Sequence, residues 1–253
     1  MTVSKPRPSL MQRIRAVEPA PPWNLTSVLV AMVVAILAFI GGTFAAEIWL
    51  SGQSIALIIG WIIGGIITII FVLQSRKTPE QRAALKLQSG AAPLLFIIFI
   101  SFGLALAIDL LSLLVTGQFV PAPALLSAAV DRQNTALLII SAVFLLIVQP
   151  VAEELVFRGV AFPVLRVGFG AWPGLIVTAA ASAIFHLLIF PAAYTVVFPD
   201  MTPAASLWYS GMNPLLAALV FGIVRAVTGS TRSAIAAHFA FALFALFKLL
   251  IGF

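Results

Sequence analysis

The sequence has no cysteine, only two histidines and few charged residues. The absence of cysteine from its 253 residues excludes a disulfide framework and a thiolate zinc site. Charged residues make up 9% of the chain, whereas a soluble domain usually carries about a quarter. Hydrophobic residues make up 62%, more than a soluble core can hide. The composition therefore predicts a membrane protein whose first partner is the lipid bilayer.

Long apolar runs recur along the chain. A helix crosses a bilayer in about 20 residues. The segments that meet this length are 25–50, 54–74, 91–116, 134–157, 171–190, 207–227 and 232–252. An eighth span arises if one long segment contains two helices. We therefore predict an all-α fold, a polytopic transmembrane helix bundle of about seven to eight spans.

Basic residues between the spans indicate the topology. The net charge of +6 would suggest nucleic acid as a partner of a soluble protein, but these charges lie between apolar runs, so no nucleic acid is expected. The positive-inside rule places the N-terminus and the loop 75–90 in the cytosol, with 117–133 and 191–206 outside. Arg225 and Arg232 are then cytosolic anchors. We expect a multi-pass protein of a bacterial plasma membrane.

Three local patterns add detail. Residues 1–22 are basic and proline-rich and predict a cytosolic tail without ordered structure. The run Thr78-Pro79-Glu80-Gln81 is typical of a helix start and predicts a surface helix over 79–88. Gly60 and Gly64 form a GxxxG pair, which can mark a helix contact in membranes.

Ionisable side chains inside a bilayer are costly, so each marks a candidate functional site. Glu154 and Arg158 are four residues apart in the fourth span, so they share a helix face and can pair. Glu153 points about 100° away from that face. The two carboxylates therefore have different environments, and a partly desolvated Glu153 suits proton transfer.

Both histidines of the chain, His186 and His238, also lie in apolar segments. A single histidine in such a helix is typically a hydrogen-bonded packing residue. Glu154 and Arg158 alone fit a structural ion pair. Together with Glu153, however, these residues come from three spans of the C-terminal half. Their combination favours one buried polar pocket.

This arrangement resembles a family of intramembrane glutamic proteases, the CAAX-protease and bacteriocin-processing family, which includes abortive-infection and Rce1-like proteins. The similarity covers about residues 134–253. The motifs that carry it are Glu153-Glu154-x-x-x-Arg158-Gly159, then His186, then His238 soon after Thr228-Gly229-Ser230. The resemblance divides the chain into the tail 1–22, accessory transmembrane helices over 23–130 and a protease-like core over 131–253.

The resemblance implies an endopeptidase that cleaves a membrane-associated peptide or protein near the cytosolic face, without a cofactor. Glu153 is then the general base that activates water, and His186 helps to hold that water. Glu154 and Arg158 orient the site, and His238 stabilises the oxyanion. A carboxylate base and an imidazole donor both suit a site where water is scarce.

Two positions depart from the family pattern. Ser182 stands where the family usually has phenylalanine, four residues before the first histidine. Ala242 stands where it has asparagine or aspartate, four residues after the second. The second departure removes an expected oxyanion donor, which costs about 10²–10³ in rate. Asn213 or Ser233 would be the substitutes.

Other functions stay open at this stage. Glu153, His186 and His238 are a possible set of zinc ligands, although the chain has no HExxH motif. Ala242 favours a non-catalytic scaffold or immunity protein of the same fold. A small-solute or proton transporter would use buried Glu and His, but the halves lack matching broken helices. Glu47 and Asp109 are expected to be structural.

Overall fold

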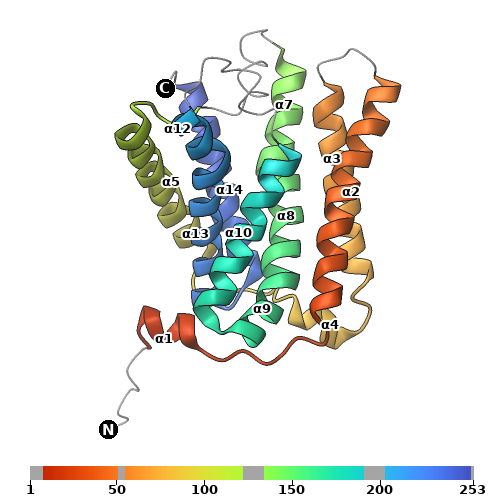
Figure 1. Ribbon diagram of the computed structural model, residues 1–253, viewed down its shortest axis with the longest axis vertical. Coiled ribbons are helices and arrows are strands. Elements are labelled where there is room, and N and C mark those ends of the chain that lie inside the picture. The colour runs from red at the N-terminus through yellow and green to blue at the C-terminus, as the bar shows by residue number, and fades with distance from the viewer. Residues whose placement is uncertain (1–7, 51–54, 122–133, 191–202, 252–253) are drawn as a thin grey trace.

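The computed structural model describes residues 8–50, 55–121, 134–190 and 203–251, which form helices and no strand. Seven helices in this part of the chain are long and apolar enough to cross a membrane, so the prediction of an all-α bundle with seven spans is confirmed (Figure 1). Six begin or end close to the predicted bounds: α2 (Leu25–Trp49), α3 (Ala56–Gln74), α5 (Leu94–Thr116), α10 (Ala171–Ile189), α13 (Asn213–Thr228) and α14 (Thr231–Leu250).

The fourth span is longer than predicted. It runs from Thr135 to Phe169, whereas the sequence suggested an end at 157. Its parts are α7 (Thr135–Val143), the π-helical η1 (Phe144–Val148), α8 (Gln149–Glu154), the π-helical η2 (Leu155–Ala161) and α9 (Phe162–Phe169). Arg158, the residue just after the predicted end, is fully buried inside this helix.

Each π-helical stretch ends two residues before a proline. Pro150 follows η1, Pro163 follows η2, and Pro214 follows a third stretch, η3 (Trp208–Met212). A proline in a helix removes one backbone N–H and its ring crowds the carbonyl four residues earlier. A locally widened turn relieves that conflict without ending the helix. Such turns are common at functional sites, and two of them flank α8.

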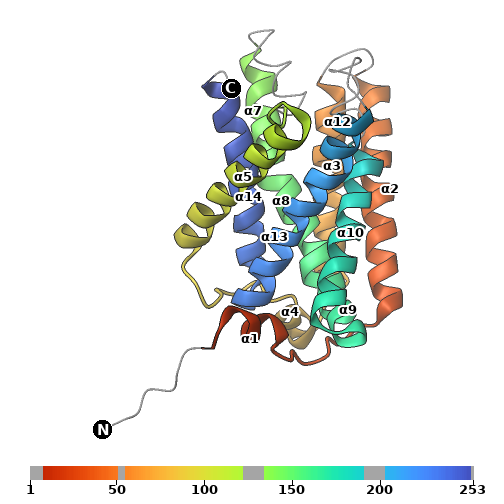
Figure 2. The ribbon, with the colours of Figure 1, turned by 60° about the vertical axis from the view of Figure 1, so that its left-hand side comes forward.

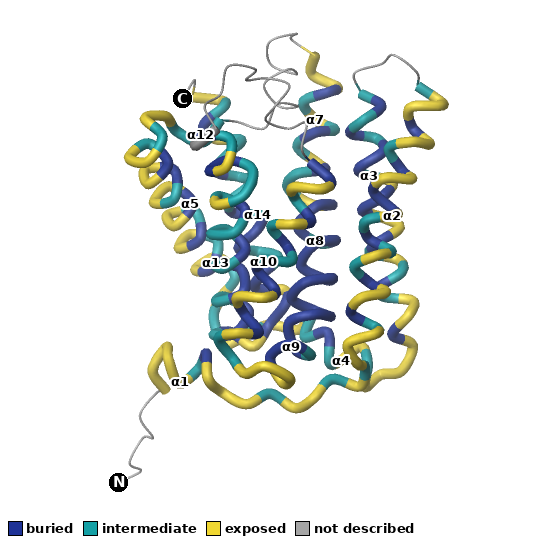
Figure 3. The backbone as a smooth tube through the Cα atoms, in the orientation of Figure 1, coloured by how far each residue is buried: buried dark blue, intermediate teal, exposed yellow. Residues whose placement is uncertain are grey.

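The centre of the bundle is the fourth span. Figure 3 shows buried backbone along α8 and exposed positions on the outward faces of α2 and α5. The helices α10 and α14 pack beside the fourth span, and α13 packs between them. Figure 2 shows that α5 is tilted against α14 at one edge of the bundle. The fourth span is thus covered from several sides.

At the opposite edge, α2 and α3 form a tightly packed pair. A Cβ atom added at Gly64 would come within 2.5 Å of the Cα of Phe39, and one at Gly60 would overlap the backbone of Thr43. The GxxxG pair therefore allows a close helix contact within one chain, as small residues do in membranes.

The two acids expected to be structural differ in their surroundings. Glu47 is exposed near the end of α2. Asp109 is buried and accepts hydrogen bonds from Lys248 Nζ at 2.8 and 2.7 Å, and Lys248 also reaches the carbonyl of Val120 at 2.7 Å. This pair joins α5 to α14, as a structural reading of Asp109 predicts.

Short elements close one end of the bundle. The helix α4 (Pro79–Ala84) has the predicted capping box, with the Gln81 N–H 3.1 Å from Thr78 Oγ1. It ends before residue 88, because Lys86 has a left-handed backbone with φ of 56°. The helix α1 (Leu10–Arg15) lies at the same end (Figure 1).

The described part of the N-terminal segment, residues 8–22, packs against the bundle, whereas the composition suggested no ordered structure over 1–22; residues 1–7 lie outside the described residues. The Ile14 side chain is buried in a cluster with Phe162 and Leu175. Glu18 pairs with Arg166 at 3.0 Å and with Arg225 at 2.9 Å. Arg225, expected to be a cytosolic anchor, is a buried cation paired with Glu18, so the segment holds α9 and α13 together.

The ion pairs of Glu18 predict a pH-dependent stability. Burial raises the pKa of Glu18, but the hydrogen bond and charge of Arg225 and the charge of Arg166 outweigh it, so that pKa lies below its usual value. A lowered folded-state pKa stabilises the protein above the unfolded pKa, and the effect is lost as pH falls through the folded value. Glu18→Gln is expected to lower stability at pH 7 by about 2 kcal/mol.

Thermal unfolding in detergent from pH 7 to pH 3 measures the predicted contribution of Glu18 to stability. The gap in Tm between wild type and Glu18→Gln should narrow below about pH 4. Glu80→Gln, at an exposed position of α4, is the matched control and should unfold like wild type. Equal Tm values for wild type and Glu18→Gln at pH 7 would show that the ion pairs of Glu18 do not stabilise the protein.

Candidate active site

The five predicted site residues come from three spans and meet at mid-bundle. Glu153 and Glu154 end α8, Arg158 lies in η2, and the histidines lie on α10 and α14. The two glutamates and the arginine are 2%, 0% and 0% exposed. In that buried setting each charge needs a partner, and the partners divide the residues into two groups.

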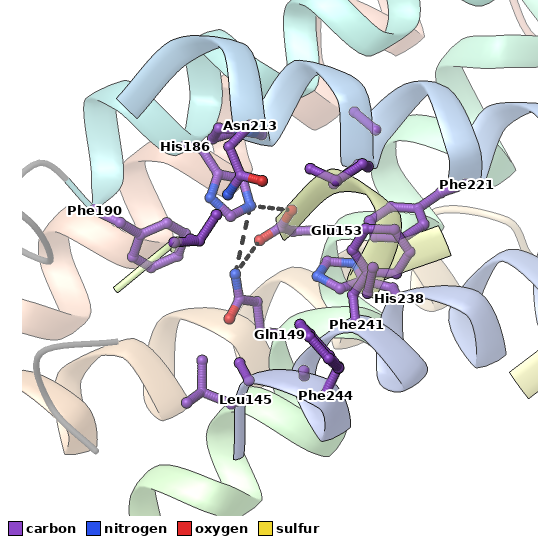
Figure 4. A pocket seen from close by; sticks show the side chains of 18 of the residues that line it. Leu145, Gln149, Glu153, His186, Phe190, Asn213, Phe221, His238, Phe241 and Phe244 are labelled. Carbon is purple, nitrogen blue, oxygen red and sulfur yellow. Dashed lines mark hydrogen bonds and ion pairs between the residues drawn. The ribbon is translucent and has the colours of Figure 1, made fainter. Parts of the chain in front are cut away.

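Glu153 forms the first group with His186. Its Oε2 lies 2.9 Å from His186 Nε2, and its Oε1 accepts a hydrogen bond from Gln149 Nε2 at 2.8 Å. Figure 4 shows the three side chains converging, with Gln149 also 3.5 Å from the same imidazole nitrogen. The carboxylate is thus held from two sides, and the partly exposed His186 connects it to the cavity.

Glu154 forms the second group with Arg158 and His238. Its Oε1 accepts from Arg158 Nη1 at 3.1 Å and lies 3.1 Å from His238 Nδ1. This confirms the expected i,i+4 pair. Because Nδ1 is engaged, Nε2 is the His238 nitrogen left to meet a ligand. The imidazole also stacks on Phe221, with ring centroids 4.5 Å apart.

Arg158 connects this group to the neighbouring helices. Besides Glu154, it donates to Ser182 Oγ at 3.3 Å and to the carbonyl of Ala218 at 2.5 Å. Ser182 is one of the two departures from the family pattern. Its hydroxyl here serves as an acceptor for the guanidinium, so this departure adds a polar contact between η2 and α10.

A cavity of about 190 Å³ opens beside these groups. Glu153, His186 and His238 all line it, together with Ala242 and Asn213. Figure 4 shows Asn213 beside His186. Of the two proposed substitutes for the missing amide, Asn213 is therefore on the cavity wall. Ser233 is buried and is not among the residues that line the cavity.

The rest of the cavity wall is mainly apolar and aromatic. It continues past the site to the buried pair of Asp109 and Lys248. Its larger apolar side chains are Trp61, Ile108, Phe144, Leu145, Phe190, Phe221, Phe241 and Phe244. A mainly apolar wall with a few convergent polar groups is typical of a ligand site.

The extended fourth span explains how His186 reaches Glu153. If that span ended at 157, an α10 beginning at Ala171 would carry His186 too deep into the membrane. The helix instead continues for 16 residues beyond Glu153 to Phe169, roughly 24 Å at 1.5 Å per residue. His186 lies 15 residues into the returning helix, roughly 22 Å. The two lengths match.

Sequence reasoning missed Gln149 as a site residue. The signal was present, because a polar amide one helical turn before Glu153 in an apolar span needs a partner. The aromatic Phe221 under His238 had no comparable signal. Its stacking depends on how α13 packs against α14, which no local pattern encodes.

Three ionisable side chains on the cavity wall are also close enough to one another to bind a metal ion together. One ligand atom each from Glu153, His186 and His238 lie within 4.8 Å of one another. Two imidazoles and a carboxylate are a donor set found in catalytic zinc sites. These residues therefore fit zinc by chemistry and by proximity.

Fold and site together define a polytopic membrane protein with a buried carboxylate–imidazole site on a cavity wall. Residues 135–244 match the family model for type II CAAX prenyl endopeptidase Rce1-like proteins. This part of the chain is similar to the Rce1-like family, and it contains all five predicted site residues. Comparison with curated proteins and with solved structures gives no significant match.

Proposed function

We propose that the protein is an intramembrane endopeptidase that hydrolyses a membrane-associated peptide or protein near the cytosolic face. The observation that carries this proposal is the contact of Glu153 with His186, at 2.9 Å, on the wall of a cavity that His238 also lines. Reconstitution with a single-span reporter peptide, followed by identification of the new termini, tests it.

Glu153 acts as the general base in this proposal. A water held by Glu153 and His186 loses a proton to the carboxylate while its oxygen attacks the carbonyl carbon of the substrate. The C–N bond of the tetrahedral intermediate then breaks, and Glu153 returns the proton to the departing amine. Gln149 keeps the carboxylate in place through its hydrogen bond at 2.8 Å. One carboxylate thus serves both proton transfers.

His238 stabilises the negative charge that develops on the carbonyl oxygen. Its Nδ1 contact with Glu154 and its stacking on Phe221 fix the ring. In the doubly protonated form of the ring, Nδ1–H donates to Glu154 while Nε2–H donates to the oxyanion. A preorganised donor of this kind is most effective where water is excluded. Arg158 holds Glu154 and thereby acts as a positioning residue.

The second departure from the family pattern gives a prediction. Ala242 lies one helical turn after His238 and lines the cavity. Ala242→Asn restores an amide donor and is expected to raise kcat about 10-fold, less than a fully preorganised donor gives, because its surroundings have not adapted to it. The measurement is cleavage of the reporter per folded protein.

The matched control for this substitution is Ala236→Asn, on the same helix but not among the residues that line the cavity. It should leave kcat near the wild-type value. A kcat for Ala242→Asn at or below that of wild type would refute an oxyanion site limited by the missing amide.

A zinc-dependent hydrolase is the second candidate, favoured by the proximity of the three ligand atoms. Glu153, His186 and His238 would hold the ion, which would supply Lewis acidity. Metal analysis and activity in 1,10-phenanthroline separate the two candidates. Stoichiometric zinc and loss of cleavage favour the metal; full activity of metal-free protein favours the carboxylate mechanism.

The orientation in the membrane is part of this proposal. We place the end with α1, α4 and α9 in the cytosol (Figure 1). The basic residues gather there: Arg13, Arg15, Arg76, Lys77, Arg82, Lys86, Arg166, Arg225 and Arg232. This distribution follows the positive-inside rule. The predicted outer loops 117–133 and 191–206 lie largely outside the described residues.

A further inference from the structure

A second cavity, separate from the candidate active site, lies where α2 begins and α3 ends. Its volume is about 700 Å³, within the range of about 300–1,000 Å³ for ligand pockets. It shares no lining residue with the first cavity. Its walls are Pro21, Pro22, Trp23, Asn24, Thr26, Ser27, Val30, Phe71, Ser75, Arg76 and Gln81.

Arg76 is the charged residue of this cavity, and it is 4% exposed. The other three buried arginines, Arg158, Arg166 and Arg225, each form an ion pair with a glutamate. Within the ranges that the structure describes, Arg76 has no carboxylate partner. It donates through Nη1 to Ser75 Oγ at 2.6 Å and to the Val72 carbonyl at 3.5 Å.

The remaining surroundings of Arg76 do not neutralise its charge. Its guanidinium lies 5.2 Å from the ring centroid of Trp23, a favourable but weak contact. Burial lowers the pKa of Arg76, because removal from water disfavours the charged form. A buried cation of this kind is costly unless it is paired. The partner must then come from outside the described chain.

We infer that Arg76 and the surrounding cavity bind the phosphate of an anionic membrane phospholipid. The cavity lies at the ends of two spans, since α2 begins at Leu25 and α3 ends at Gln74. That is the depth of the lipid headgroups. Arginine is well suited to phosphate because its planar fork donates two parallel hydrogen bonds.

The apolar part of the cavity favours a lipid over free phosphate. Val30 and Phe71 line it on the membrane side of Arg76, and Val30 is 47% exposed. An acyl chain can follow these side chains while the headgroup meets Ser27 and Gln81. The nearby Arg82, whose Nε donates to the Arg76 carbonyl at 3.2 Å, adds attraction for an anionic membrane surface.

Lipid retention tests this site. The purified protein is incubated in detergent with equal amounts of phosphatidylglycerol and phosphatidylcholine of the same acyl chains and is then repurified. Mass spectrometry of the bound lipid should show about 10-fold enrichment of phosphatidylglycerol, as a charge-assisted contact predicts. Arg76→Gln should remove the enrichment, whereas Lys77→Gln at the exposed neighbour should keep it.

A second variant covers the case in which Arg76→Gln does not fold. Thr26 is exposed at the cavity wall, and Thr26→Glu brings a carboxylate that competes with the lipid phosphate while it offers Arg76 a partner. Folded Thr26→Glu should lose the enrichment. Equal retention of both lipids by wild type, or unchanged enrichment in the folded variants, would overturn the site. Inorganic phosphate that raises Tm as much as phosphatidylglycerol does would overturn the lipid assignment.

Discussion

Glu153→Gln is expected to lower kcat for reporter cleavage by about 10³-fold, because the amide cannot accept the proton of the attacking water. The substitution keeps the size of the side chain. Its carbonyl can still accept the hydrogen bond that Gln149 gives to Glu153 at 2.8 Å. The variant should therefore fold and bind substrate, and the loss should appear in kcat.

Glu47→Gln is the matched control, since Glu47 is an exposed glutamate on α2 and does not line the cavity. It should cleave like wild type. Both variants should unfold within a few degrees of the wild-type Tm. Cleavage by Glu153→Gln at the wild-type rate would exclude this carboxylate as the general base.

Arg158→Met is expected to lower the free energy of unfolding by about 3–5 kcal/mol. The arginine is fully buried and holds Glu154, Ser182 and the Ala218 carbonyl. Its removal leaves the Glu154 carboxylate without its arginine partner. Denaturant unfolding in detergent measures the loss. A change below about 1 kcal/mol would contradict the assigned role, because surface substitutions have effects of that size.

Two further variants show how much of the stability loss in Arg158→Met comes from the unpaired charge and how much from lost packing. Arg232→Met, at an exposed position near the start of α14, should change stability little. The double variant Glu154→Gln, Arg158→Met removes both charges and should recover part of the loss, because no unpaired carboxylate remains. If the double variant loses the sum of the two single effects, the ion pair does not couple these residues.

The spans and the polar site residues could be predicted from the sequence because both stand out against an apolar background. A bilayer requires long apolar helices. It also makes each buried ionisable group conspicuous, which identified Glu153, His186 and His238. The pairing of Glu154 with Arg158 followed from their spacing on one helix. These features are local, and local patterns are what a single sequence encodes best.

The features that could not be predicted from the sequence depend on packing between segments that are far apart in the chain. Arg225 looked like a loop anchor, because its partner Glu18 lies more than two hundred residues earlier, in a segment with no apolar periodicity. Arg158 looked like the end of a span. The helix continues through η2 and α9 because Glu154 pairs with this charge and because α10 and α13 supply hydrogen-bond acceptors for it. The prolines after each π-helical stretch were visible, but a proline alone predicts a break as readily as a widened turn.

The most direct test is the cleavage of a single-span reporter peptide by the purified wild-type protein in vesicles prepared in H₂¹⁸O. If Glu153 activates water for peptide hydrolysis, mass spectrometry will find two new termini at one peptide bond, with ¹⁸O in the new carboxylate. Glu153→Gln in the same vesicles will leave the reporter intact. An uncut reporter with folded wild-type protein across a panel of span sequences would contradict the protease and favour a non-catalytic scaffold.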